Sequence, residues 1–334
     1  MTTILAAHTC NMYGRRGSSR LLMGVLRTSG LALVGLALAA VAKPARGQTA
    51  DDGIMLSRLK YCTGVFGTYD TWDHYWEGST FRGNGNIGAI TTRKVQYIGN
   101  YGVTNHVNVL FNVPYIWTSA SQGVLHGQSG WQDFSVSVKA KVISVPIGDK
   151  GALRTMAVVS GSVPMSRYTP DDMPMSIGTQ SNTVNGRVTE NYLGRNGIYI
   201  NGTTSYSIRG NVQLARPEYY TNGQLYLSSQ VAMPNVFDWN VSGGYRKNDM
   251  TLVARYSQQQ TRGGGDIRQQ DMPFVSNRMN FSRIGGTATI PVPRVRDLQY
   301  WFIYDYTLQG RNVGQANTAT VGLLYTFTFE KRTK

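Results

Sequence analysis

The fold is decided by the stretch TATVGLLYTFTF, which runs from Thr318 to Phe329. Apolar and polar residues alternate along it, and only Leu324 interrupts the polar set. Because successive side chains of a strand point to opposite faces, this period of two places the apolar set on one face. Aromatic residues crowd into the end of that face, at Tyr325, Phe327 and Phe329. An apolar outer face with an aromatic end is typical of a strand in a transmembrane β-barrel.

The same stretch resembles the terminal strand by which bacterial outer-membrane barrels are handed to their assembly machinery. The aromatic-x-aromatic ending of the stretch carries this resemblance, which implies the barrel assembly machinery as a partner. Family members usually stop at the final Phe, whereas this chain continues with a C-terminal tail over residues 330–334. The alternative is the edge strand of a soluble β-sandwich.

Residues 1–47 have the composition of a signal peptide. Four arginines precede the apolar run 31–42, and Ala40-Val41-Ala42 and Ala45-Arg46-Gly47 offer small residues for cleavage. We therefore predict a signal peptide over 1–47, a periplasmic lead-in over 48–58 and a transmembrane barrel over 59–329.

Charge and hydropathy limit the other classes of protein. Residues 1–47 hold six basic and no acidic residues, which leaves 27 basic and 18 acidic residues and a net charge of +9. An exported basic chain has little access to nucleic acid, so we expect no nucleic-acid partner. Mean hydropathy is −0.26, and no later stretch of about 18 apolar residues predicts a membrane helix. Cys62 is the one cysteine after residue 47, so no intramolecular disulfide is expected.

The period-two pattern recurs about twelve times along the chain, which predicts an all-β, antiparallel transmembrane barrel of about twelve strands. An even number agrees with both chain ends lying on the periplasmic side. Pro217 interrupts the segment 215–224, where an extra pair of strands would raise the count to fourteen. The strands are expected at 59–70, 94–101, 107–117, 134–142, 153–163, 198–214, 225–233, 237–245, 250–256, 284–290, 298–308 and 318–329.

The connections predict the orientation of the barrel, because such barrels have short periplasmic turns and longer extracellular loops. The short connections, expected in the periplasm, are 103–106, 145–150, 246–249 and 291–297. The long ones, expected outside the cell, are 71–90, 118–131, 164–196, 262–277 and 309–317.

The run Gly99-Asn100-Tyr101-Gly102-Val103-Thr104-Asn105-His106, with Pro114-Tyr115, resembles the outer-membrane family linked to the meta-pathway of phenol degradation. The resemblance extends over most of residues 60–329. It implies a channel or transporter of the bacterial outer membrane that passes small, often hydrophobic or aromatic solutes and contacts membrane lipids. It brings no catalytic residue and no cofactor. A structural or adhesive barrel is the alternative.

The polar residues opposite each apolar set are expected to line the lumen. Arg or Lys facing lipid costs roughly 2–4 kcal/mol at the membrane midplane, which favours the inward position. A lumen of net positive charge favours anionic solutes, including carboxylated aromatics. Alternatively, carboxylates of an inward-folded loop, such as Asp171, Asp172 or Glu190, pair with these cations and brace the wall. The basic set is Lys60, Lys94, Lys139, Lys141, Arg154, Arg209, Arg255 and Arg283, and the acidic set is Asp70, Asp238 and Asp305.

Candidates for an enzyme or a metal site lie in the predicted loops. His74 beside Asp73 is a possible base near the outer rim, whereas His106 and His126 lie apart from any motif. Neither of two acidic clusters has a recognised ligand spacing, and Gly263–Gly265 lacks the Lys-Ser/Thr of a phosphate loop. We expect solvated loops, no metal and no catalytic residue. The two clusters are Asp70, Asp73, His74 and Glu77, and Asp171 and Asp172 with Met165, Met173 and Met175.

Overall fold

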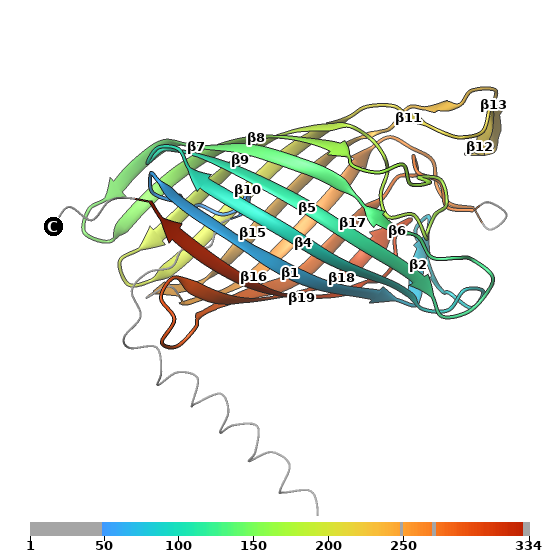
Figure 1. Cartoon of the computed structure of the whole chain (residues 1–334). Coiled ribbons are helices and arrows are strands. Elements are labelled where there is room, and N and C mark those ends of the chain that lie inside the picture. The colour runs from blue at the N-terminus through green and yellow to red at the C-terminus, as the bar shows by residue number, and fades with distance from the viewer. Residues whose placement is uncertain (1–48, 248–249, 269–271, 330–334) are drawn as a thin grey trace, which may run out of the picture. The chain divides into compact units, whose positions relative to one another are not determined.

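A computed structural model describes residues 49–247, 250–268 and 272–329 of the chain (Figure 1). The predicted signal peptide and the predicted C-terminal tail lie outside these residues. No helix in the described part is long and apolar enough to span a membrane.

Twelve long antiparallel strands form a closed barrel (Figure 1). Each barrel strand pairs with its neighbours along the chain, and β1 closes the barrel by pairing with β19 from Asn317 to Thr328. This confirms the predicted twelve-stranded barrel and excludes fourteen. The strands are β1 (Lys60–Trp72), β4 (Ile90–Gly102), β5 (Val107–Ala120), β7 (Asp133–Ile147), β8 (Gly151–Pro164), β9 (Thr183–Gly194), β10 (Ile198–Arg209), β15 (Asn235–Lys247), β16 (Met250–Arg262), β17 (Asn280–Pro291), β18 (Leu298–Arg311) and β19 (Asn317–Thr328).

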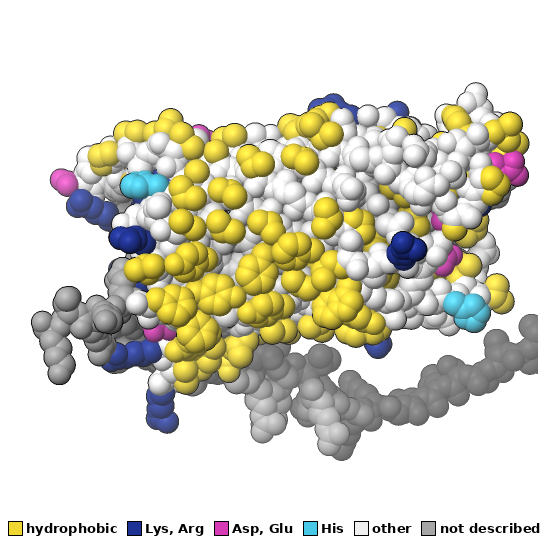
Figure 2. Space-filling view, turned by 45° about the horizontal axis from the view of Figure 1, so that its top comes forward, with side chains coloured by type: hydrophobic (Ala, Val, Ile, Leu, Met, Phe, Trp, Pro, Cys, Tyr) yellow, Lys and Arg dark blue, Asp and Glu magenta, His cyan; other side chains and the backbone are white. Residues whose placement is uncertain are grey.

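The alternation of β19 has the predicted orientation. Val321 and Leu323 are 58% and 43% exposed on the outer face, whereas Leu324 is only 2% exposed inside the barrel. The register aligns Leu323 with Val65 of β1, which is also exposed. Hydrophobic side chains cover much of the wall between the two ends (Figure 2). A wall of this kind faces the lipid of a membrane without exposing backbone groups, because every strand edge is paired.

Seven short strands lie in the described loops between the barrel strands. They are β2 (His74–Glu77), β3 (Thr80–Gly83), β6 (Ser129–Trp131), β11 (Val212–Gln213), β12 (Tyr219–Thr221), β13 (Gln224–Tyr226) and β14 (Gln230–Val231). All belong to the connections at one end of the barrel, where the long loops gather (Figure 1). The short turns lie at the other end, so by the usual orientation of such barrels the long-loop end is extracellular.

One predicted strand is misplaced along the chain. The segment 164–196, expected as a single loop, contains β9, and the segment 225–233, expected as a barrel strand, lies in an extracellular extension. Gly186 and Glu190 interrupt the apolar outer face of β9, so the hydrophobic alternation is weak there. The predicted strand 198–214 correspondingly ends at Arg209.

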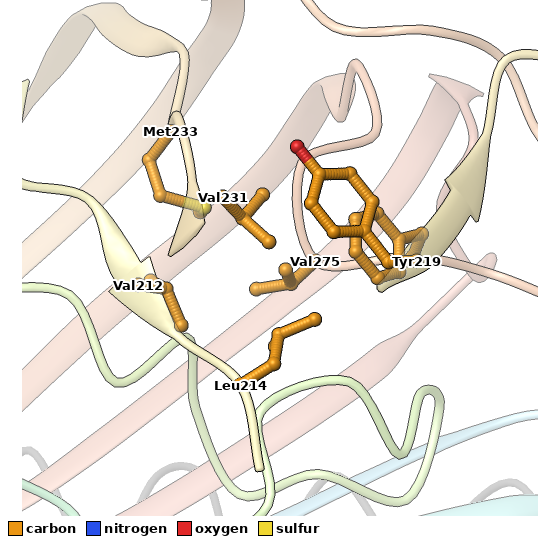
Figure 3. Packing of buried hydrophobic residues seen from close by; sticks show 7 residues of the cluster. Val212, Leu214, Tyr219, Val231, Met233 and Val275 are labelled. Atoms are coloured by element: carbon orange, nitrogen blue, oxygen red, sulfur yellow. The ribbon is translucent and has the colours of Figure 1, made fainter. Parts of the chain in front are cut away.

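The extension between β10 and β15 shares a hydrophobic cluster with the connection between β16 and β17, which explains the misleading alternation after residue 224. Val231 and Met233 pack there instead of facing lipid (Figure 3). The ring of Tyr219 stacks between Tyr226 and Phe274, with centroids 5.0 and 5.2 Å away. The full cluster is Val212, Leu214, Tyr219, Val231, Met233, Phe274 and Val275.

The described part of the predicted periplasmic lead-in enters the barrel, and this corrects its expected position. Leu56 is 1% exposed and packs in a cluster with Cys62, Phe66, Trp301 and Leu324, all on inward faces of the wall. Leu324 breaks the polar set of β19 because it faces this cluster and not water. We call residues 49–58 the luminal segment.

Candidate functional site

The strand register places the predicted luminal residues on inward faces. Lys94 lies opposite Thr68, Asp70 lies opposite Thr318, and Arg283 lies opposite Thr307. All these positions share a face with the buried Cys62 or Trp301 and alternate with exposed apolar residues. The same register gives inward positions for Lys60, Lys139, Lys141, Arg154, Arg209, Arg255, Asp238 and Asp305.

The luminal segment supplies carboxylates to two of the basic residues. Lys139 has no exposed side-chain surface, and its Nζ donates to Asp52 Oδ1 at 2.7 Å and to the carbonyl of Thr49 at 2.8 Å. Arg187 of β9 pairs with Asp51 at 2.6 Å. A buried ammonium needs a partner of this kind, because an unpaired charge in the interior is costly.

Side chains of β10 hold the backbone of the same segment. The amide of Asn201 and the hydroxyl of Thr203 donate to the carbonyl of Asp51 at 3.0 and 3.1 Å. Tyr199 Oη accepts a longer hydrogen bond, of 3.5 Å, from the backbone N–H of Gly53. The segment is therefore fixed to the wall by charge, by backbone hydrogen bonds and by the apolar contacts of Leu56.

Asp171, Asp172 and Glu190, the alternative carboxylates predicted from the sequence, have other partners in the described structure and do not pair with the predicted luminal cations. Asp171 pairs with Arg216 of the extracellular extension, and Asp172 accepts a hydrogen bond from Gln128. Glu190 faces the outside of the barrel, where it accepts a hydrogen bond from Thr155 at 3.0 Å. Carboxylates do pair with luminal cations, but these carboxylates belong to Asp51 and Asp52 of the luminal segment.

The wall itself pairs one further luminal cation, Arg255, whereas Arg283, Lys94 and Arg209 form no ion pair among the described residues. Arg255 donates two hydrogen bonds to Asp305, at 2.7 and 2.8 Å. Arg283 donates from Nε to Thr307 Oγ1 at 3.1 Å, and its guanidinium lies 4.3 Å from the centroid of Phe281. No carboxylate of the described residues lies within 4.0 Å of Arg283.

Three cavities follow one another through the lumen. A cavity of about 330 Å³ at mid-lumen is lined by Arg187, Arg255 and Arg283 together with Asp238 and Asp305. A second, of about 250 Å³, shares Arg255 and Asp51 with it and reaches Trp301. A third, of about 430 Å³, opens at the short-turn end and is lined by Lys141, Arg154, Arg246 and Lys247. Neighbouring cavities share lining residues, so they lie next to one another along the luminal segment.

A loop narrows the extracellular mouth. Tyr168 and Ile177, from the connection between β8 and β9, pack on the inward-facing Ile116. Thr118 Oγ1 donates to the carbonyl of Met175 at 2.6 Å, and Tyr168 Oη donates to Asp133 at 2.8 Å. Burial raises the pKa of Tyr168, so its phenol stays protonated and keeps donating.

The histidine and carboxylate candidates do not form a metal centre. Asp73 and His74 form a hydrogen bond of 2.8 Å on the rim, and this bond lowers the pKa of Asp73. Glu77 instead pairs with Arg82, and Asp70 faces the lumen. Within the described residues, no group of three or more His, Cys, Asp or Glu side chains could hold a metal ion.

The other histidines and the glycine run also stay apart from the lumen's charged residues. His106 is exposed in a short turn and His126 is exposed in an extracellular loop. Gly263 and Gly264 adopt positive φ values of 129° and 82° in the loop that follows β16, which fits a turn-forming role.

Sequence reasoning missed four charged residues of the lumen. Arg187 lies in the strand that was read as a loop, although the polar alternation Asn185-x-Arg187-x-Thr189-x-Asn191 is a detectable signal. Arg246 was assigned to a turn but is the inward-facing partner of Thr251. Asp51 and Asp52 carry no periodic signal, because they lie in an irregular segment.

The closed barrel, its lipid-facing wall and its polar lumen define the class of the protein, a transmembrane β-barrel of the outer-membrane type. Among solved structures, the COG4313 outer membrane channel from Pseudomonas putida F1 superposes with a TM-score of 0.66 at 12% identity, covering 85% of this chain and 100% of that chain. At this identity the likeness shows the fold alone.

Two further outer-membrane structures are less similar. The NanC porin has a TM-score of 0.42 at 12% identity, covering 79% of this chain and 98% of that chain. OpdL from Pseudomonas aeruginosa has a TM-score of 0.35 at 10% identity, covering 81% and 99%. No family model and no curated protein matches the sequence. The resemblance to the phenol-degradation family therefore stays a prediction.

Proposed function

We propose that this protein is a passive channel of the bacterial outer membrane that passes small solutes and prefers anions. The observation that carries the proposal is the succession of cavities along the lumen. Three arginines and three carboxylates line the mid-lumen cavity, and four basic residues, Lys141, Arg154, Arg246 and Lys247, line the cavity at the short-turn end. The solved channel from Pseudomonas putida, which shares the fold, supports the same class of function. Aromatic solutes that carry a carboxylate fit the combination of Arg283 with the ring of Phe281.

Arg283 is the residue on which the preference depends most. Its guanidinium lines the mid-lumen cavity and is held by Thr307 and Phe281, with no described carboxylate in contact. Asp70 and Asp305 lie near enough to interact with this guanidinium electrostatically, but neither forms an ion pair with it, so its remaining N–H donors can bind a passing carboxylate or phosphate. Arg255, by comparison, is already engaged by Asp305.

The proposal is tested by the reversal potential of the purified protein in planar bilayers under a salt gradient. We expect anion selectivity in the unmodified protein, weaker selectivity in Arg283→Gln and a shift towards cations in Arg283→Glu. Arg195→Gln is the matched control, because Arg195 lies in a short turn and its side chain is 71% exposed. It should leave the reversal potential unchanged.

Two results would overturn the proposal. Cation selectivity of the unmodified protein, or a reversal potential that Arg283→Glu does not move, refutes the anion preference. A correctly folded barrel that never conducts, and whose loss leaves the uptake of every tested small solute unchanged, supports the alternative of a structural barrel.

A further inference from the structure

An arginine lies on the lipid-facing side of the barrel, in a row of aromatic residues. The register of β1, β4 and β5 aligns Tyr69, Arg93 and Trp117 across three neighbouring strands. All three side chains are exposed on the outer face. Among the described residues, Arg93 has neither an ion pair nor a side-chain hydrogen bond. A cation on this face is unusual, because the surrounding wall is apolar.

The row lies close to the extracellular end of the wall. Arg93 is three residues from Ile90, the outer end of β4, and Trp117 is three residues from Ala120, the outer end of β5. A strand rises about 3.3 Å per residue and is tilted by roughly 40° in such barrels, so the row lies about 8 Å below the strand ends. Aromatic residues at this depth mark the level of the lipid headgroups.

A hollow of about 780 Å³ opens in the wall beside the arginine. It exists because Gly67 and Ala319 are small: a Cβ atom at Gly67 would meet nothing within 4 Å. Val95 and Val321 give the hollow an apolar lining below the charged and aromatic row.

We propose that this hollow binds a phosphate-bearing lipid of the outer leaflet, with the phosphate on Arg93 and an acyl chain over Gly67. A planar guanidinium recognises phosphate through two hydrogen bonds, and the charges are complementary. Tyr69 and Trp117 flank the headgroup, and the apolar lining takes the chain. This inference rests on the barrel fold alone and is independent of what the lumen conducts.

Native mass spectrometry of the detergent-purified protein tests the proposal with dipalmitoyl phosphatidic acid and dipalmitoylglycerol, which share their acyl chains and differ by the phosphate. We expect retention of the phosphatidic acid to exceed that of the diglyceride. Loss of a charge-assisted hydrogen bond costs about 1.5–3 kcal/mol, so Arg93→Gln should weaken binding about tenfold or more. Inorganic phosphate is added as a competitor and should not displace the lipid.

Two further variants test the acyl-chain site and the specificity of the charge at Arg93. Gly67→Val fills the hollow without touching Arg93 and should also reduce retention of phosphatidic acid. Arg262→Gln is the control, because Arg262 lies on the outer face at the end of β16 and its guanidinium is 5.2 Å from the Phe237 ring. The proposal is wrong if Arg93→Gln, in a barrel that still shows heat-modifiable migration, retains phosphatidic acid as the unmodified protein does. The proposal is also wrong if the unmodified protein retains the two lipids equally, or if Gly67→Val retains as much phosphatidic acid as the unmodified protein.

Discussion

Replacing Asp52 by alanine should release the luminal segment from the wall. In the docked state Lys139 has no exposed surface and depends on Asp52 and on the carbonyl of Thr49. After the replacement, docking would bury an ammonium with a single neutral acceptor. Undocking gives Lys139 access to water in the lumen, so the change favours the undocked state.

The size of the effect follows from the cost of a broken buried ion pair. Removing one partner costs about 3–5 kcal/mol, and each 1.36 kcal/mol is a factor of ten. The ratio of docked to undocked segment should therefore fall by about two to four orders of magnitude. The other anchors oppose release: Arg187 still pairs with Asp51, and Leu56 stays buried with Trp301.

Cys62 provides a direct assay. It is the one cysteine after residue 47, it faces the lumen, and Leu56 packs on it in the docked state. Its labelling by a hydrophilic maleimide should therefore report the undocked fraction. We expect labelling of Asp52→Ala to accelerate by up to about the same two to four orders of magnitude, with an increase in single-channel conductance.

Asp149→Ala is the matched control, because Asp149 is a 99% exposed carboxylate of a short turn with only a 3.4 Å pair to Arg195. Its labelling rate and conductance should equal those of the unmodified protein. If Cys62 of Asp52→Ala stays as protected as in this control, the ion pair does not hold the segment and the reasoning fails.

Four other outcomes are expected. Leu56→Ala removes a buried side chain, which costs about 2–5 kcal/mol, so it should also accelerate labelling of Cys62. Hydrogen bonds from Arg311 hold the pKa of Asp266 at about 2, below its ordinary value of about 3.9, so this contribution to stability is present above about pH 4 and is lost as the pH falls towards 2. Protease sensitivity of the loop that carries Asp266 should rise in that window, and Asp266→Asn should show no such step. His74→Ala should leave conductance and barrel assembly unchanged, because His74 contacts only Asp73 and Phe81 through its ring in the described structure. The protein in detergent should give a β-rich spectrum and heat-modifiable migration; a helical spectrum would contradict the barrel.

The barrel could be predicted because, in most of its strands, apolar residues on the lipid-facing side alternate with polar residues on the inward side. In β19, Val321 and Leu323 face lipid while Thr320 and Thr326 face inward, and the same alternation recurs in β5 and β18. A strand with lipid on one side and polar contents on the other needs only local sequence to show its orientation. Strand β9 fails this condition, since Glu190 takes an outward position where an apolar residue would be expected.

The contents of the lumen could not be predicted in the same way. Asp51 and Asp52 reach Lys139 and Arg187 across separations of about 90 to 140 residues, and no periodicity links an irregular segment to a wall position. Leu324, Phe66 and Trp301 are apolar residues at inward positions of the strands and indicate an apolar contact inside the barrel. Their partner Leu56 became evident from the packing, because the residue lies in a segment that reads as a simple connection.

The pairing inside the lumen also changes what the positive charge can do. A sum of the formal charges of the inward-facing residues treats every cation alike. Three of these cations, however, form ion pairs: Lys139 with Asp52, Arg187 with Asp51, and Arg255 with Asp305. These pairs contribute little net field at mid-lumen, because each charge has its opposite within about 3 Å. Selectivity should therefore follow the luminal cations that form no ion pair among the described residues, which include Arg283, Lys94 and Arg209, and not the sum. Lys139→Glu should disturb docking of the luminal segment, whereas Arg283→Glu should move the reversal potential with Cys62 still protected. Equal shifts of the reversal potential in the two variants, with no difference in labelling, would show that the summed charge controls the pore.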